Sequence, residues 1–253
     1  MHTHHAARGF ERSALSYDRG RPEYPPEAAL SLLDRCGIDA SSRVLELGAG
    51  TGKFTRFVLG RTGHLVASDP SPAMRRRFHE RFPSVPCVGA LAECLPAAPA
   101  VFDAVICAQC FHWFADAEAM AEIERVLAPG GRLGLIWNVR DEGVSWIAAL
   151  TEIIDRHAGD APRYSSGDWK QALAFAGELE ALQEETHRHV VVCDRATVLD
   201  RVASISFIAA LEVPQHRQVL DQVETLLDTH PDTEGRELWD FPYRTDLYWC
   251  ERR

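Results

Sequence analysis

The sequence lacks any apolar stretch approaching the roughly 20 residues that a helix needs to cross a bilayer. Residues 1–20 are polar and have no apolar centre of the kind that marks a secretory signal, so we expect a cytoplasmic protein. Internal repeats and low-complexity linkers are missing as well. With 46% apolar residues in a chain of 253, the composition predicts an ordinary globular protein with one large core.

Paired cysteine motifs are equally scarce. The seven cysteines are odd in number and irregularly spaced, unlike a secreted disulfide framework. Cys107 and Cys110 form one C-x-x-C, whereas a structural zinc site usually takes four ligands from two such pairs. The pair ends a strand that reads as buried, which favours a structural or pocket role over a redox dithiol. The histidines at 2, 4, 5, 187 and 189 lack an ordered ligand set, so we predict no metal site.

Basic residues are fewer than acidic residues in this sequence. Lys and Arg number 27 against 37 Asp and Glu, which gives a formal net charge of −10. Phosphate backbones and anionic membranes attract clustered positive charge, so neither nucleic acid nor a membrane is an expected partner. The main basic run, at 75–81, also contains Glu80 and is interpreted as a solvated helix face.

Five apolar strands alternate with helices in the first half of the chain. We expect these strands at 43–47, 64–69, 85–89, 101–107 and 132–138. Such nearly continuous apolar runs are typical of a parallel sheet covered on both faces. Further on we expect two strands, at 186–193 and 241–250, and helices at 144–157, 169–176, 195–211 and 214–230. The sequence therefore predicts an α/β fold: a Rossmann-like, seven-stranded, mostly parallel sheet with a helical cap from C-terminal insertions.

The segment from Glu46 to Gly52 (ELGAGTG) joins the first strand to a helix. Its glycines permit a sharp turn and close approach of a ligand, and the helix N-terminus presents free N–H groups to it. Asp69 ends the next strand, where a carboxylate can bind ribose hydroxyls. A dinucleotide fingerprint G-x-G-x-x-G would place its third glycine at Lys53, so the spacing here is a different one.

These motifs resemble those of class I S-adenosylmethionine-dependent methyltransferases. The resemblance rests on V-L-E-L-G-A-G-T-G at 44–52, the acid at 69, A-L-A-E at 90–93, F-D-A-V at 102–105 and L-A-P-G-G at 127–131. The segment Q-C-F-H-W-F at 109–114, the N-terminal stretch 17–25 and the segment 242–246 further resemble a small-molecule branch that includes trans-aconitate methyltransferase-like proteins. The cofactor implied is S-adenosylmethionine, and the product S-adenosylhomocysteine.

The resemblance implies a single methyltransferase domain, 1–253, with a binding core at 43–138. Residues 1–40 would cover the cofactor, 139–240 would supply the cap helices and sixth strand, and 241–253 the final strand. The cofactor contacts that it implies are Tyr17, Gly48, Ala49, Gly50, Asp69, Met74, Ala92, Glu93, Ala108 and Gln109.

Each assigned residue has a physical role that suits this cofactor. Glu46 is predicted to receive the ammonium group of its methionine part, and Asp69 the ribose diol. Met74 would form a polarisable apolar wall against the adenine. Glu93 is either a contact to the adenine edge or a solvated loop carboxylate.

The residues that would bind the methyl acceptor are predicted with more alternatives than those that would bind the cofactor. His112 is predicted as the catalytic residue, acting either as a base or as a hydrogen-bonding wall of the site. Trp113 either lines the cofactor pocket or packs in the core. The predicted substrate-binding residues are Arg21, Tyr24, Trp137, Asn138 and Arg244, since an arginine fork suits a carboxylate, although each arginine alone reads equally as an ion-paired surface residue.

The function expected from the sequence is therefore in-line methyl transfer to a small molecule, with a carboxylate or hydroxyl acceptor preferred. A carboxylate needs no base, whereas an alcohol does. Two alternatives stay open: an NAD(P)-dependent oxidoreductase on a similar sheet, and a cofactor-binding regulator without turnover. We expect a monomer or a homodimer.

Overall fold

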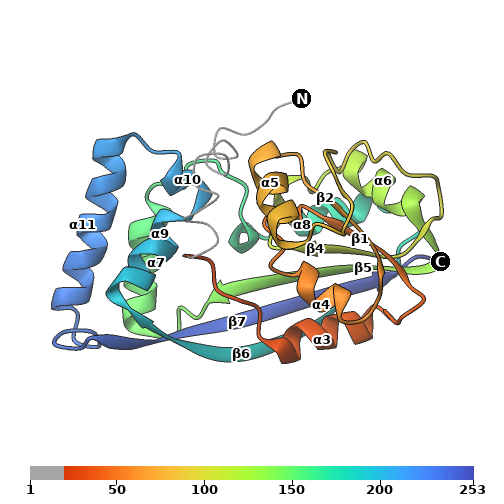
Figure 1. Ribbon diagram of the computed structural model, residues 1–253. Coiled ribbons are helices and arrows are strands. Elements are labelled where there is room, and N and C mark those ends of the chain that lie inside the picture. The colour runs from red at the N-terminus through yellow and green to blue at the C-terminus, as the bar shows by residue number, and fades with distance from the viewer. Residues whose placement is uncertain (1–19) are drawn as a thin grey trace. The chain divides into compact units, whose positions relative to one another are not determined.

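The computed structural model describes residues 20–253, and Figure 1 shows the order of their helices and strands. This part of the chain divides into two compact units. Unit 2 consists of residues 24–138, 162–187 and 245–253, and unit 1 of the remaining described residues, 20–23, 139–161 and 188–244. The single domain expected from the sequence stays a prediction.

Parallel strands form the centre of unit 2. They are β1 (Arg43–Leu47), β2 (His64–Ser68), β3 (Cys87–Val88), β4 (Phe102–Ala108) and the first part of β5 (Leu127–Arg140). Together with β6 (Gln183–Asp194) and β7 (Leu238–Glu251) they form a seven-stranded sheet of order β3-β2-β1-β4-β5-β7-β6. The predicted seven-stranded, mostly parallel α/β fold is confirmed.

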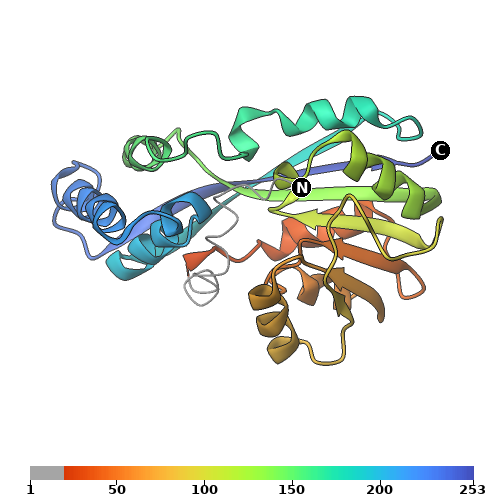
Figure 2. The same ribbon diagram turned by 90° about the horizontal axis from the view of Figure 1, so that it is seen from above.

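Helices cover both faces of the sheet in unit 2. Figure 2 shows α3 (Pro26–Arg35), α4 (Thr55–Leu59) and α5 (Pro72–Arg81) on one face, and α6 (Ala117–Val126) and α8 (Trp169–Ala172) on the other. The first three helices bury apolar side chains such as Leu32 and Phe78 against strand residues such as Ile106. Three short 3-10 helices complete the unit, namely η2 (Phe111–Trp113), η3 (Tyr164–Ser166) and η4 (Leu173–Phe175).

Two helices of this unit begin directly after a residue whose side chain caps the first turn. The Ser71 hydroxyl accepts a hydrogen bond from the backbone N–H of Met74, and Pro72 follows as the first residue of α5. The Asp116 carboxylate likewise accepts from the N–H of Ala119 at the start of α6. In both cases the side chain satisfies an N–H group that the first helical turn leaves unpaired, which fixes the boundary.

Unit 1 packs four helices around the remaining parts of β5, β6 and β7. The helices are α7 (Ser145–Asp155), α9 (Arg195–Ala203), α10 (Ser206–Ala209) and α11 (Val213–Thr229), with a core that contains Trp146 and Phe241. The single helix expected at 195–211 is wrong. Ser204 bonds through its hydroxyl to the Arg201 carbonyl, and Ile205 then adopts an extended backbone that separates α9 from α10.

β5 also begins earlier than the expected residue 132. The glycine pair 130–131 joins the sheet, since Gly130 N–H donates to the Arg252 carbonyl and Arg252 N–H donates to the Gly131 carbonyl. A register shift between β4 and β5 accommodates this irregular start. Within residues 20–253, no helix combines the length and the apolar character needed to span a membrane.

Candidate active site

The turn after β1 holds its glycines in the left-handed region of the backbone. φ is +60° at Gly48 and +59° at Gly50, values that residues with a Cβ rarely adopt. A Cβ on Gly48 would lie 2.8 Å from Cys110 Sγ, so this glycine permits close packing of the segment after β4. A Cβ on Gly50 would meet no atom of residues 20–253 within 4 Å. The turn is therefore packed at Gly48 and open at Gly50.

Asp69 follows β2 and reaches back to this turn. Its Oδ2 accepts a hydrogen bond of 2.9 Å from Gly50 N–H, and its Oδ1 accepts one of 2.8 Å from Ser71 N–H. The carboxylate is buried, and burial raises its pKa although both backbone bonds act in the opposite direction. Because a carboxylate has about four lone-pair sites, both oxygens retain capacity for ligand hydroxyls. The structure thus brings the predicted acid to the predicted turn.

Glu46, in β1, has a carboxylate with one satisfied and one unsatisfied oxygen. Oε2 accepts a 2.6 Å hydrogen bond from the Thr55 hydroxyl, whereas the buried Oε1 has no hydrogen-bond partner among residues 20–253. Burial raises the pKa of this group to about 8, the Thr55 bond opposes the rise and the charge of Asp69 adds to it. A buried acceptor without a donor costs about 1–3 kcal/mol, so this oxygen indicates a missing cationic or N–H partner.

The loops that follow β2 and β3 carry the next predicted residues. Met74 is buried on α5, and Ala92 is buried in a tight turn closed by the Cys94 N–H to Leu91 carbonyl bond. Glu93, in the same turn, has a buried Oε2 without a hydrogen-bond partner in the described chain. Its carboxylate is therefore not the fully solvated loop group of the alternative interpretation, and a contact to a ligand remains the prediction.

The basic run at 75–81 is only partly the solvated face that the sequence suggested. Arg75 donates to the backbone carbonyls of Asp69 and Pro70, and Arg81 donates to that of Thr51. Arg75 therefore stabilises the turn after β2, and Arg81 stabilises the glycine turn after β1. The solvated-face interpretation fails for Arg75, which is half-buried, whereas Arg81 is exposed although it donates to the Thr51 carbonyl.

The segment after β4 is strained. Ala108 ends the strand, and Gln109 follows with φ of +62°, a conformation that is costly for a residue with a Cβ. Its backbone N–H donates to the Ile136 carbonyl at 2.9 Å, and its side-chain Nε2 donates to the Asn138 carbonyl at 3.0 Å. The two hydrogen bonds hold the strain in place. Such strain tends to persist at functional sites.

A hydrogen bond from Trp137 determines where His112 carries its proton. Trp137 Nε1 lies 3.2 Å from His112 Nδ1, and an indole N–H can only donate. Nδ1 must therefore accept, and the neutral imidazole carries its hydrogen on Nε2. Trp113 lies next along the chain, half-buried, with its ring centroid 5.5 Å from that of His112. His112 is thus held as an Nε2–H donor.

Comparison with known proteins assigns the family. A model described as a methyltransferase domain matches residues 45–135. Across 248 residues the chain is 36% identical to an uncharacterized methyltransferase-like protein of Schizosaccharomyces pombe, with 96% of this chain and 95% of that protein covered. The chain belongs to the methyltransferase family.

Solved structures agree with this methyltransferase at the level of the fold. A putative type II methyltransferase from Anaeromyxobacter dehalogenans matches with a TM-score of 0.64 at 22% identity, over 92% of this chain and 97% of that one. A phosphoethanolamine N-methyltransferase of Haemonchus contortus, solved with S-adenosylhomocysteine, matches with a TM-score of 0.53 at 16% identity, over 89% and 52% of the two chains. The predicted class I S-adenosylmethionine-dependent family is confirmed, while its trans-aconitate methyltransferase-like branch stays a prediction.

Beside His112, the methyltransferase has a buried aromatic cluster that sequence reasoning missed. The Trp137 ring lies 4.8 Å from that of Tyr164 and 4.7 Å from that of Trp169. The buried Asp246 carboxylate accepts from the Tyr164 hydroxyl at 2.6 Å and from Thr186 at 2.8 Å. The available signal was an acid at position 246 directly before the apolar run at 247–250 of an expected strand. Tyr164 and Trp169 lie in short 3-10 and helical turns and gave none.

The predicted substrate residues are distributed unevenly. Asn138 lies in unit 2 with its Oδ1 accepting from the Thr245 hydroxyl at 2.7 Å. Tyr24 is buried, with its ring edge against Phe54 at 5.3 Å, which indicates a packing role, and we omit it from the proposed site. Arg21 and Arg244 belong to unit 1, and Tyr17 lies outside the described residues. The substrate role of both arginines stays a prediction.

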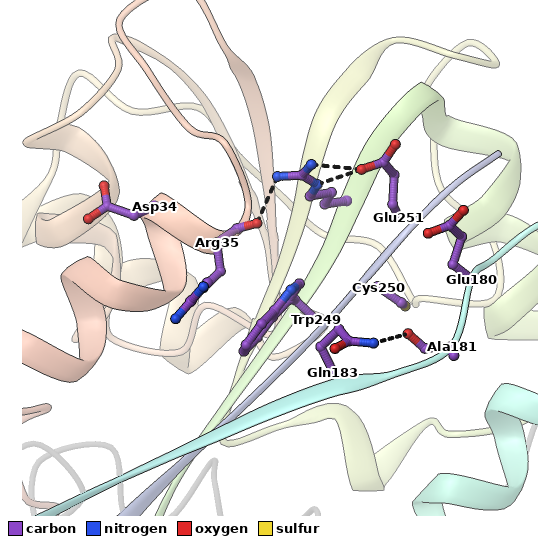
Figure 3. Close-up of a pocket in the computed structure, with 9 residues that line it drawn as sticks. Asp34, Arg35, Glu180, Ala181, Gln183, Trp249, Cys250 and Glu251 are labelled. Atoms are coloured by element: carbon purple, nitrogen blue, oxygen red, sulfur yellow. Dashed lines mark hydrogen bonds and ion pairs between the residues drawn. The ribbon is translucent and has the colours of Figure 1, made fainter.

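A surface pocket of about 350 Å³ lies in unit 2 near the start of β5, at the opposite strand ends from the glycine turn (Figure 3). Most of its charged groups are ion-paired, with one another or with neighbouring residues. Arg132 donates to Glu251 at 2.7 and 3.0 Å, and Arg35 pairs with Glu185 while lying over the Trp249 ring. We assign this pocket no ligand.

Proposed function

We propose that this methyltransferase binds S-adenosylmethionine at the glycine turn and methylates a small molecule with a carboxylate or hydroxyl acceptor. The observation that carries the proposal is the buried, unpartnered Oε1 of Glu46 beside an open Gly50. A cationic ammonium group is the partner that such an oxygen lacks. The solved relative with S-adenosylhomocysteine supports the same cofactor.

The residues present fit this cofactor. Glu46 would hold the ammonium group, Asp69 the ribose hydroxyls, and Met74 and Glu93 the adenine. When bound, the cofactor supplies a methyl group on a positively charged sulfur, an excellent leaving group. The remaining task of the chain is to align the acceptor and to exclude water.

His112 bears on which acceptor is preferred. A hydroxyl group has to lose its proton to act as a nucleophile, and a base must take that proton. The lone pair on His112 Nδ1 is engaged by Trp137, and Nε2 carries a hydrogen, so the neutral side chain donates rather than accepts. A donor suits an acceptor that is already ionised. This geometry therefore favours a carboxylate over a hydroxyl.

Calorimetry with S-adenosylmethionine, S-adenosylhomocysteine and NADPH tests the cofactor. We expect binding of the first two and none of the third, and we expect Asp69→Ala to weaken binding by about 10- to 100-fold, or roughly 1–3 kcal/mol, because ligand hydroxyls lose a charged partner. Asp103→Ala is the matched control, since Asp103 is an exposed carboxylate that pairs with Arg43.

Three outcomes would contradict the proposal. Binding of NADPH without S-adenosylmethionine would favour the oxidoreductase alternative. Unchanged affinity in Asp69→Ala would show that the acid serves only the turn. Tight cofactor binding with no release of S-adenosylhomocysteine, under prolonged incubation with varied acceptors, would favour the non-catalytic regulator.

A further inference from the structure

Unit 1 contains a second group of buried polar atoms, built on an aromatic surface. Arg201, in the last turn of α9, has its Cζ 4.8 Å from the ring centroid of Phe241 and 5.4 Å from that of Tyr243. These two buried rings stack on one another at 4.9 Å, and Tyr243 stacks on His189 at 5.4 Å. The rings hold the guanidinium group against a flat apolar face.

The guanidinium group of Arg201 is not satisfied by this packing. Its Nε and Nη1 are buried and have no hydrogen-bond acceptor within the described chain. Contact with aromatic rings stabilises a cation by less than the free energy lost when a charged donor is enclosed without an acceptor. The two nitrogen atoms therefore indicate a missing anionic acceptor.

Arg140 supplies a second guanidinium group, whose charge acts on the same tyrosine as that of Arg201. Arg140, at the end of β5, donates from Nε to the Thr151 hydroxyl at 3.0 Å, which is a neutral acceptor. Burial lowers the pKa of Arg140, and the charge of Arg21 lowers it further. The positive charges of Arg201, Arg140 and Arg21 all act on the Tyr243 hydroxyl, although burial still raises the pKa of that group to about 12.

Two of the titratable groups beside Arg201 are uncharged. Tyr243 is uncharged at neutral pH because burial raises its pKa to about 12. The Cys193 thiol stays protonated because burial raises its pKa, against the influence of Arg201. Asp155 and Glu142 act on Arg140 through space.

We propose that Arg201 and Arg140 form a carboxylate-binding site in unit 1. A planar carboxylate accepts paired N–H bonds from a guanidinium fork, and the buried Phe241 and Tyr243 make the surroundings apolar. A phosphate dianion is the poorer fit, because its stronger hydration would be lost in these surroundings. The proposal does not depend on the proposed function, because the carboxylate bound here is not assigned as the methyl acceptor.

Benzoate is the probe, and benzamide, which has the same shape without the charge, is its matched control. We expect benzoate to raise the melting temperature of the full chain in a concentration-dependent way, and to bind by calorimetry, whereas benzamide does neither. Inorganic phosphate forms a third arm, which distinguishes an organic acid from a phosphate group. We expect its binding to be weaker than that of benzoate.

Substitutions then locate the site. Arg201→Met keeps the apolar stem against the rings and removes the fork, so benzoate affinity should fall about tenfold or more. Arg140→Met should weaken binding in the same direction, and Arg201→Lys, which keeps the charge but not the fork, should give an intermediate loss. Arg217→Met is the control, because Arg217 is an exposed residue of α11 paired with Asp221, and affinity should not change.

Each affinity is compared with the melting temperature of the same variant without ligand, so a general loss of folding is recognised. Equal binding of benzamide, unchanged benzoate affinity in both Arg201→Met and Arg140→Met, stronger binding of phosphate, or no benzoate binding at all would overturn the proposal. Failure of S-adenosylmethionine to bind the wild-type chain would instead overturn the proposed function, since benzoate binding is measured without the cofactor.

Discussion

Each unit holds buried polar atoms that have no hydrogen-bond partner among the described residues. In unit 2 they include carboxylate oxygens of Glu46 and Glu93. In unit 1 they include the guanidinium nitrogens of Arg201. Folding does not favour burial of such groups without partners, so each set is best explained by a ligand of the complementary charge. The comparison teaches that unit 2 is suited to a cation such as a sulfonium with its ammonium group, and unit 1 to an anion.

The two units also differ in what they contribute to a reaction. Unit 2 has His112 with its proton position fixed by Trp137, and a strained backbone at Gln109. The cluster in unit 1 consists of groups that carry permanent positive charge or stay neutral. We therefore expect substitutions in unit 2 to change turnover or cofactor binding, and substitutions at the arginine cluster to change binding of the anion.

The largest effect that we expect is a loss of turnover on substitution of His112, which tests the difference between the two units. We expect His112→Ala to lower kcat by about 100-fold, since a positioned hydrogen-bond donor is lost, and to leave cofactor and benzoate affinity within about twofold. His112→Gln, which places an amide N–H near the position of Nε2 but cannot act as a base, should retain most of the activity. Steady-state kinetics and calorimetry give the two quantities.

A base would behave differently from a donor. If His112 accepted a proton, the glutamine variant would be as inactive as the alanine variant, and wild-type activity would fall as the imidazole becomes protonated at low pH. The 15N shifts of the His112 ring provide a check that needs no acceptor. A hydrogen on Nδ1 rather than Nε2 would contradict the assignment.

The second prediction concerns pH and Glu46. The pKa of this group is raised to about 8, above the ordinary value near 4.5, so the ligand-free folded protein holds a proton there that the unfolded chain releases. The stability that this group contributes is present below pH 4.5 and is lost as pH rises toward 8. Urea unfolding across this range should show the decline, and Glu46→Gln, which has no proton to exchange, should flatten it.

Cofactor binding should show the opposite trend. An ammonium group beside Glu46 favours the ionised carboxylate, so binding below pH 8 releases a proton, and affinity rises by up to about tenfold per pH unit toward 8. Calorimetry in two buffers of different ionisation enthalpy measures that proton. The glutamine variant corrects for titration of the ligand itself and should bind benzoate as the wild type does. The same proton release in Glu46→Gln would remove Glu46 from the site.

Much of the fold follows from local signals in the sequence. Apolar runs predicted the strands, and the caps that the structure shows at Ser71 and Asp116 are local in the same way, because each acts within a few residues. The break between α9 and α10 and the early start of β5 were not predictable in this way. The first depends on a backbone turn at Ile205, and the second on pairing with Arg252, which is distant in the sequence.

The candidate site shows the same division. The turn at 48–52 and Asp69 could be predicted because a strand-to-helix motif and a strand end place them. The bond from Trp137 to His112 and the contacts of Asp246 with Tyr164 could not, since each joins segments separated by 25 or more residues in the sequence. In unit 1, the sequence pointed to Arg21 but not to Arg140 or Arg201. Nothing in the sequence distinguishes these two residues from exposed arginines, because their burial depends on contacts with distant segments.

The smallest expected effect comes from relieving backbone strain, and it tests whether the strain at Gln109 contributes to cofactor binding. Ala100 and Gln109 both adopt positive φ, at 55° and 62°. Ala100→Gly should relieve this strain at an exposed position and stabilise the chain by about 1 kcal/mol, a rise of roughly 2–4 °C in melting temperature, without changing cofactor affinity. Gln109→Gly relieves the same strain but loses the bond to the Asn138 carbonyl, so it should bind cofactor less tightly. If both variants left cofactor affinity unchanged, the strain at Gln109 would belong to the fold alone.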